Sequence, residues 1–190
     1  MAYRRRRLRE KRSNLAIPLL IIAIMVLSVI GYSLLQGNQN NVKRYNGFKF
    51  VRVADNQWVT EFDNIELRFY FSPEEVQDIK HQSFTSLPYH TYLTSNPTAD
   101  YSQQDLMAIE VGKFELKNIL FGLGYTPMIN FSDTISCANS SSALGVIDLD
   151  IANETAIDVQ GNCIKIKGRN GPEVIRARDK FLMLLLGILE

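Results

Sequence analysis

Cys137 and Cys163 are the two cysteines of the chain, and they lie 26 positions apart. Thiols pair in oxidising compartments, and an even number leaves none over. We therefore expect a Cys137–Cys163 disulfide, which would stabilise the fold by roughly 3 kcal/mol in the chain-entropy description. Two unpaired thiols or a metal site are the alternatives. A zinc site would need two more ligands, and His81 and His90 are not at ligand spacing from either cysteine.

A second candidate for chemistry is the pair Asp148 and Asp150, which alternate along an apolar stretch and so share one face of a strand. We expect Asp158 to lie near them. Paired carboxylates can hold a divalent cation or transfer protons. No partner histidine, no partner lysine and no Gly-rich phosphate loop accompanies them in the sequence. We therefore interpret them as the water-facing side of a strand, and keep a weak metal site as the alternative.

Three Asn-x-Ser/Thr triplets begin at Asn130, Asn139 and Asn153. This triplet is the acceptor for N-glycosylation, which requires a surface position outside the cytoplasm. Each triplet is a weak signal by itself, but three of them fall within 26 residues, from Asn130 to Thr155. They predict an extracytoplasmic glycoprotein.

The N-terminus combines a basic arm with an apolar span. Residues 1–14 contain seven of the 21 lysines and arginines and a single acidic residue, Glu10. An uncharged stretch follows from Leu15 to Leu35. A helix of that length spans roughly 30 Å, the thickness of the hydrocarbon core of a bilayer. We predict a basic cytoplasmic arm at 1–14 and a transmembrane helix at 15–35, in contact with the lipid bilayer.

The orientation follows from the positive charges, which favour the cytoplasmic side of a first membrane helix. The arm alternatively binds RNA or carries a sorting signal. A cleaved signal peptide is the alternative to an anchor, but the apolar stretch is longer than usual and no A-x-A site follows it. We expect an uncleaved signal-anchor of the cell membrane, with the C-terminal part outside the cytoplasm.

The remainder divides into a polar linker at 36–46 and a single domain at 47–190. Outside the basic arm the chain is mildly acidic. Nucleic-acid binding needs a basic face, so we expect no nucleic acid among the partners.

The sequence of the domain predicts mainly strands, with a few helices. Alternating and apolar runs predict strands at 47–53, 57–62, 65–72, 89–97, 125–131, 145–152 and 156–168, the last divided at 160–162. Helix-start signals predict helices from 73 to about 81, from 102 to 121, and from 171 onward. The fold class is α/β (an α+β sandwich): one mixed or mainly antiparallel sheet packed by about three helices, besides the transmembrane helix.

Two helical faces can be assigned from the spacing of apolar residues. Met107, Val111, Phe114 and Phe121 fall on one side of the second helix. This side is broadened by Leu106, Ile109, Leu116, Ile119 and Leu120, and because so much of the helix surface is apolar, we expect the helix to pack across the sheet. In the last helix the run 181–189 is too short to cross a membrane. We expect it to face the sheet, with a membrane or oligomer contact through Leu182, Leu186 and Leu189 as an alternative.

The C-terminal pattern C-A-N-S-S, V-I-D-L, G-N-C-I-K-I-K-G and I-R-A-R-D-K-F-L-M-L-L-L-G-I resembles the tail of uncharacterised archaeal single-pass membrane proteins with a disulfide-containing extracytoplasmic domain. The opening Y-N-G-F-K-F and W-V-T are similar to the start of that domain. The resemblance covers residues 45–190. It implies the topology and the disulfide, but no activity or catalytic residue.

These observations predict a membrane-anchored binding or interaction module without a cofactor and without enzymatic activity. We expect a protein partner or oligomer at the cell surface. A membrane-tethered, metal-dependent hydrolase using Asp148 and Asp150 is one alternative, and an assembly factor of a membrane complex is another.

Overall fold

The computed structural model describes residues 21–22, 24–26, 41–53, 57–84, 86–96, 100–130 and 134–189. The chain divides into two compact units, Met1–Asn41 and Val42–Glu190. The predicted basic arm and most of the predicted transmembrane stretch 15–35 lie outside the described residues. Within that stretch, 21–22 and 24–26 are helical. Across the described ranges, no helix combines the length and apolarity that crossing a membrane requires.

The second unit opens with a four-stranded antiparallel meander, which consists of β1 (Val42–Tyr45), β2 (Phe48–Arg52), β3 (Trp58–Phe62) and β4 (Ile65–Phe69). The first strand occupies residues that we predicted as linker. It forms because Asn46 and Gly47 both take positive φ, of 44° and 86°, as a two-residue hairpin turn requires. Asp63 and Asn64 make the same kind of turn before β4.

A second, six-stranded sheet corrects the expectation of a single sheet. It contains β5 (Lys80–His81), β6 (His90–Thr94), β7 (Thr126–Ile129), β8 (Leu144–Ile151), β9 (Ala156–Gln160) and β10 (Cys163–Gly168), in the order β5-β9-β10-β8-β6-β7. The β9–β10 hairpin is antiparallel and the other pairs are parallel. The sheet is therefore mixed and mainly parallel. Sequence periodicity located these strands but did not reveal that they belong to two sheets.

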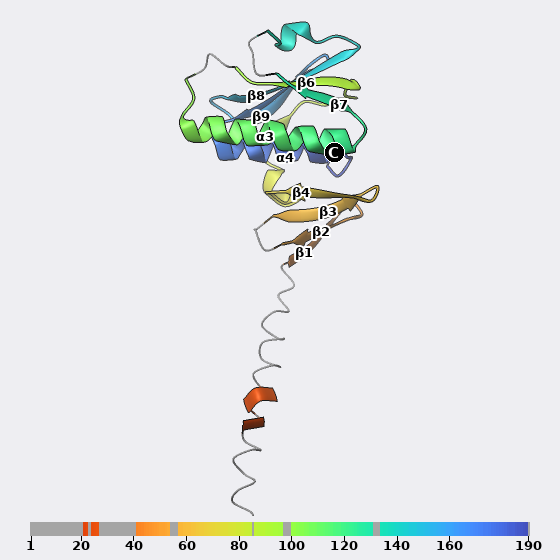
Figure 1. The fold of residues 1–190 in the computed structure, drawn as a ribbon, viewed down its shortest axis with the longest axis vertical. Coiled ribbons are helices and arrows are strands. Elements are labelled where there is room, and N and C mark those ends of the chain that lie inside the picture. Colours follow the sequence, from red (N-terminus) through yellow and green to blue (C-terminus); the bar gives the residue numbers. More distant parts are fainter. Residues whose placement is uncertain are drawn as a thin grey trace, which may run out of the picture. The chain divides into compact units, whose positions relative to one another are not determined.

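Two α-helices lie between the sheets, giving three layers (Figure 1). They are α3 (Gln103–Gly122) and α4 (Gly171–Leu185). The side chains of Ser102 and Asn170 accept hydrogen bonds from the third residue beyond each, so both predicted helix starts are confirmed. The predicted helix 73–81 is wrong beyond its first turn, because only the 3₁₀ turn η2 (Pro73–Val76) forms before the chain enters β5.

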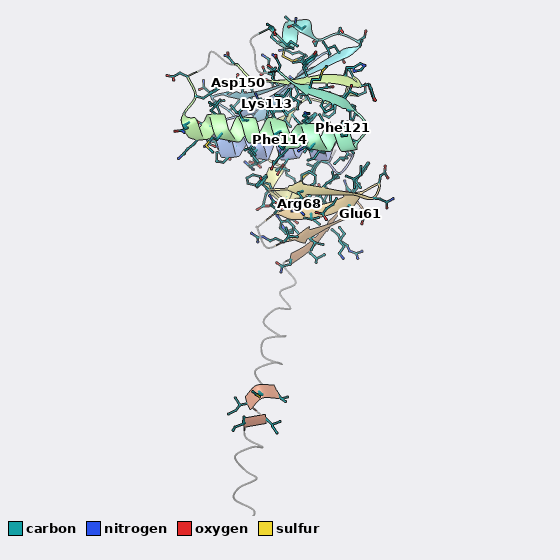
Figure 2. The ribbon with its side chains drawn as sticks, viewed as in Figure 1. Glu61, Arg68, Lys113, Phe114, Phe121 and Asp150 are labelled. Carbon is teal, nitrogen blue, oxygen red and sulfur yellow. A yellow bond between two sulfur atoms is a disulfide. The ribbon has the colours of Figure 1, made fainter. Side chains whose placement is uncertain are left out.

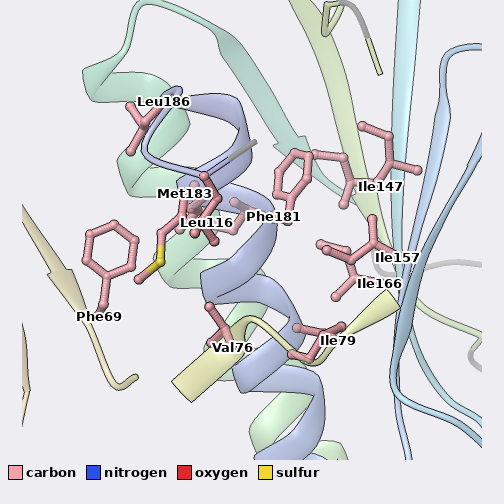
Figure 3. Packing of buried hydrophobic residues seen from close by; sticks show 14 of the residues in the cluster. Phe69, Val76, Ile79, Leu116, Ile147, Ile157, Ile166, Phe181, Met183 and Leu186 are labelled. Atoms are coloured by element: carbon pink, nitrogen blue, oxygen red, sulfur yellow. The ribbon is translucent and has the colours of Figure 1, made fainter. Parts of the chain in front are cut away.

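The core lies on both sides of α4. Phe181 faces Ile147, Ile157 and Ile166 of the six-stranded sheet, whereas Met183 lies toward Phe69 of the four-stranded sheet (Figure 3). The leucines considered for a membrane or oligomer contact, Leu182, Leu186 and Leu189, are all buried in this core. A helix between two sheets needs apolar residues on both faces, which explains the apolar run at its end.

A buried charged network joins the four-stranded sheet to both helices. The Nη1 atom of Arg178 lies 2.8 Å from Glu115 Oε2 of α3, and the Tyr70 hydroxyl donates to the other oxygen of Glu115. Asp179 Oδ2 accepts from the backbone N–H groups of Tyr70 (2.7 Å) and Phe71 (3.0 Å). Burial raises the pKa of Asp179 to about 6, against the opposing effect of Arg178. These contacts fix the position of α3 relative to α4.

Candidate functional site

The predicted disulfide is confirmed. Cys137 begins the 3₁₀ turn η3 (Cys137–Asn139), Cys163 begins β10, and their Cα atoms are 5.3 Å apart. The bond ties the loop that precedes β8 to the sheet, and no cysteine remains free. Disulfides persist in oxidising, extracytoplasmic compartments, so the bond points to that environment.

The three glycosylation triplets differ in accessibility. Asn139 and Asn153 are exposed. The side-chain amide nitrogen of Asn130 instead donates to the hydroxyl of Thr94 at 3.5 Å, and this asparagine is half-buried. Because the acceptor must be accessible for a sugar to be attached, Asn139 and Asn153 are the better candidates. Glycosylation at all three sites stays a prediction.

Asp148 and Asp150 lie on the face of the six-stranded sheet that points away from α3 and α4, since their neighbours Ile147 and Leu149 are in the core. Both are half-buried rather than open to water. The Tyr101 hydroxyl donates to Asp150 Oδ1 at 2.6 Å. Burial, together with this bond, raises the pKa of Tyr101.

Lysines of β10 lie beside these aspartates, so the expectation that no lysine accompanies them is wrong. In the register of the sheet, Lys165 is paired with Asp148, and Lys167 is paired with Asp150. Burial, helped by the charge of Asp150, raises the pKa of Asp148 to about 6, while Lys165 and Lys113 oppose the rise.

Lys167 also forms an ion pair with Asp158 at 2.5 Å. No group of three or more His, Cys, Asp or Glu side chains that could hold a metal ion occurs among the residues that the structure describes. The aspartates are thus brought together with lysines and a tyrosine, and not with a third metal ligand.

The histidines are not brought together. His81 lies in β5 and His90 in β6, and β9, β10 and β8 separate these strands. Burial and the charge of Lys180 lower the pKa of His81. The Nδ1 atom of His90 lies 2.6 Å from the Thr126 hydroxyl.

The most unusual surface lies on α3. Met107, Phe114 and Phe121 are 62%, 58% and 71% exposed, and Val111 is 45% exposed. We call these four residues, with the exposed Asn118 between them, the α3 stripe. Phe114 and Phe121 can be followed along the helix in Figure 2. The expectation that the helix packs across the sheet is confirmed for Ile109, Leu116 and Leu120, which are buried, and wrong for these four residues.

The opposite side of α3 is the buried one, and it contains Ile109, Gly112, Lys113, Leu116 and Leu120. Gly112 permits the close approach of the helix: a Cβ there would lie 3.2 Å from both Ile175 and Leu149. Lys113 is buried with its ammonium 2.7 Å from Glu110 and 3.1 Å from the Ser95 hydroxyl. Because α3 is apolar on both sides, the spacing identified the stripe but not the direction in which it points.

Comparison with known proteins gives no relative: no family model, no curated protein and no solved structure matches this chain.

Proposed function

We propose that this chain is a membrane-anchored interaction module whose domain lies outside the cytoplasm and binds a protein partner through the α3 stripe. The stretch 15–35 serves as the anchor and the basic arm 1–14 stays in the cytoplasm. The proposal gives the module no catalytic role.

The exposure of the α3 stripe is the observation that carries this proposal. A surface helix normally turns its polar side to water. Here three large apolar side chains of α3 are each more than half exposed along one line. Burying such a side chain fully gains about 1.5–3 kcal/mol, so a partner that covers the remaining half gains on the order of 1 kcal/mol from each. Contiguous exposed apolar surface of this kind marks an interaction site.

The charges beside the stripe favour a protein over a lipid surface. Glu110 and Glu115 flank it together with Lys117. A helix that lies on a membrane carries lysine and arginine along its polar flanks, because these attract anionic headgroups. The mixed flanks of α3 match a polypeptide surface instead.

The location outside the cytoplasm is supported by separate observations. The Cys137–Cys163 bond requires an oxidising environment to persist. The basic residues of 1–14 favour a cytoplasmic N-terminus, which places everything beyond an anchor at 15–35 on the other side.

Site-specific photo-crosslinking tests the proposal. Benzoylphenylalanine is placed at Phe114 of the full-length protein in its native membranes, and at Lys80 as a control. The Lys80 side chain is 84% exposed and lies on β5, at the other edge of the six-stranded sheet from β7. We expect a discrete protein adduct from position 114 and none from position 80. The absence of any adduct at 114 would overturn the proposal.

A further inference from the structure

We propose that the partner covering the α3 stripe is a second copy of this chain, with the two α3 helices packed antiparallel. This inference rests on the proposed function and adds the identity and geometry of the partner. It is carried by the spacing of the stripe and by the placement of charges beside it.

The spacing of the stripe is that of a helix–helix seam. Its members, at 107, 111, 114, 118 and 121, are separated alternately by four and three residues. This alternation keeps a row of side chains facing a second helix along its whole length. The seam lies opposite the buried side of α3, and its span from 107 to 121 gives a contact line of about 21 Å that is open to a partner.

The charges beside the seam distinguish between the two directions of pairing. In an antiparallel pair with its two-fold axis between Gly112 and Lys113, Val111 faces Phe114 of the second copy. Glu110 then lies beside Lys117 of the second copy, and the symmetry repeats this opposite-charge pair. In a parallel pair, Glu110 would lie beside Glu115 of the second copy, which brings two carboxylates together. Each of them already has a cation in its own chain, Lys113 for Glu110 and Arg178 for Glu115, so this contact offers neither a new partner. Complementary flanking charges set orientation in paired helices, so the sequence of α3 favours the antiparallel arrangement.

The apolar area that the stripe exposes is smaller than a freely diffusing dimer needs, but it suffices for two copies that are held in the same membrane. Large apolar side chains present roughly 150–250 Å² each, so the exposed parts of the stripe amount to on the order of 400 Å² per copy. A stable interface between freely diffusing proteins needs about 800 Å² per partner. Anchoring both copies in one membrane raises their effective concentration, which compensates for a small interface.

Cysteine crosslinking between two differently tagged full-length copies tests the geometry. One copy carries Met107→Cys and the other carries Asn118→Cys, both at exposed positions. In the antiparallel pair these two positions face each other. Two cysteines at position 107 would be 11 residues apart along the axis, about 16 Å, and a disulfide needs Cα atoms within about 7 Å. Lys80→Cys serves as the control. A thermal unfolding midpoint equal to that of the natural protein establishes that each variant folds.

We expect mild oxidation in membranes to give at least tenfold more mixed 107–118 dimer than either variant gives with itself. A dimer of Met107→Cys with itself would indicate parallel pairing and overturn the proposal. If no mixed dimer forms while benzoylphenylalanine at Phe114 captures a different protein, the second-copy proposal fails and the proposed function stands. If position 114 captures nothing and no dimer forms, both fail.

Discussion

Replacing Asp148 with asparagine should stabilise the protein at neutral pH and remove part of its pH dependence. Asp148 is half-buried on the face of the six-stranded sheet away from the helices, with Asp150 next to it along the same face. Burial and the charge of Asp150 together raise the pKa of Asp148 from 3.8 to about 6. The ionised form of this side chain is therefore costly in the folded state.

The size of the effect follows from the shift in pKa. A rise of roughly two units corresponds to about 3 kcal/mol, at about 1.4 kcal/mol per unit. The gain from Asp148→Asn is smaller, because the side chain is only half-buried and its attraction to Lys165 is lost. We expect the variant to be more stable than the natural protein by about 1–2 kcal/mol at pH 7.

The raised pKa of Asp148 also determines how the stability of the natural protein changes with pH. Because the folded-state pKa lies above the unfolded-state value, the folded protein binds the Asp148 proton more readily between about pH 4 and pH 6. The natural protein therefore gains stability relative to the variant as the pH falls through this window. At pH 4 the advantage of the variant should be largely gone.

Urea denaturation from pH 4 to pH 7 measures this difference, with Trp58 as the reporter. Trp58 is the single tryptophan, and it is 4% exposed on β3, so unfolding changes its surroundings strongly. Glu61→Gln, at an exposed carboxylate of the same strand, is the control and should change stability by no more than about 0.5 kcal/mol. If the difference between Asp148→Asn and the natural protein is the same at pH 4 and pH 7, the reasoning is refuted.

Three further predictions concern other parts of the domain. Removing the disulfide with Cys137→Ala and Cys163→Ala should lower the free energy of unfolding by about 3 kcal/mol in non-reducing urea titrations, and an unchanged midpoint would contradict the stabilising role. Gly168→Ala should lower the free energy of unfolding by about 1–3 kcal/mol, because its Cβ would overlap the backbone of α4. At Gly122 the nearest atom to an added Cβ is 3.8 Å away, so Gly122→Ala should leave the unfolding midpoint in urea unchanged and serves as the control. Phe114→Ser should change the stability of the isolated protein by less than about 1 kcal/mol in urea, because the side chain is 58% exposed, while abolishing crosslinking from benzoylphenylalanine placed at Phe121 in membranes; a large loss of stability would show that Phe114 is a core residue.

Most elements of the domain could be predicted from local sequence signals. The strands read from alternation are present, and the capping residues Ser102 and Asn170 start α3 and α4. The disulfide followed from two cysteines and an inferred compartment. These features depend on neighbouring residues or on simple counting, which a single sequence contains.

The missed strand β1 had a readable signal. Asn46-Gly47 between two β-prone stretches is a strong hairpin turn, and both residues do take positive φ. The division into two sheets had no comparable signal, because it depends on which strands pair across long separations. The apolar end of α4 is explained only once a sheet lies on each side of it.

The direction of the α3 stripe could not be read from periodicity alone. Ile109, Leu116 and Leu120 form one apolar side of the helix, while Phe114 and Phe121 belong to the other. A glycine inside a helix often marks close packing, and Gly112 lies on the buried side. That residue was the one local indication of which side faces the core.

Thiol accessibility on intact cells tests the central claim, that the α3 stripe is a covered interface outside the cytoplasm. Full-length Asn118→Cys and Lys80→Cys variants are treated with a maleimide that cannot cross membranes, in intact cells and after solubilisation in detergent. We predict that Lys80→Cys reacts rapidly in both states, and that Asn118→Cys reacts only after detergent separates the partners. Equal labelling of both positions on intact cells would contradict a covered stripe, and no labelling of Lys80→Cys without detergent would contradict the location outside the cytoplasm.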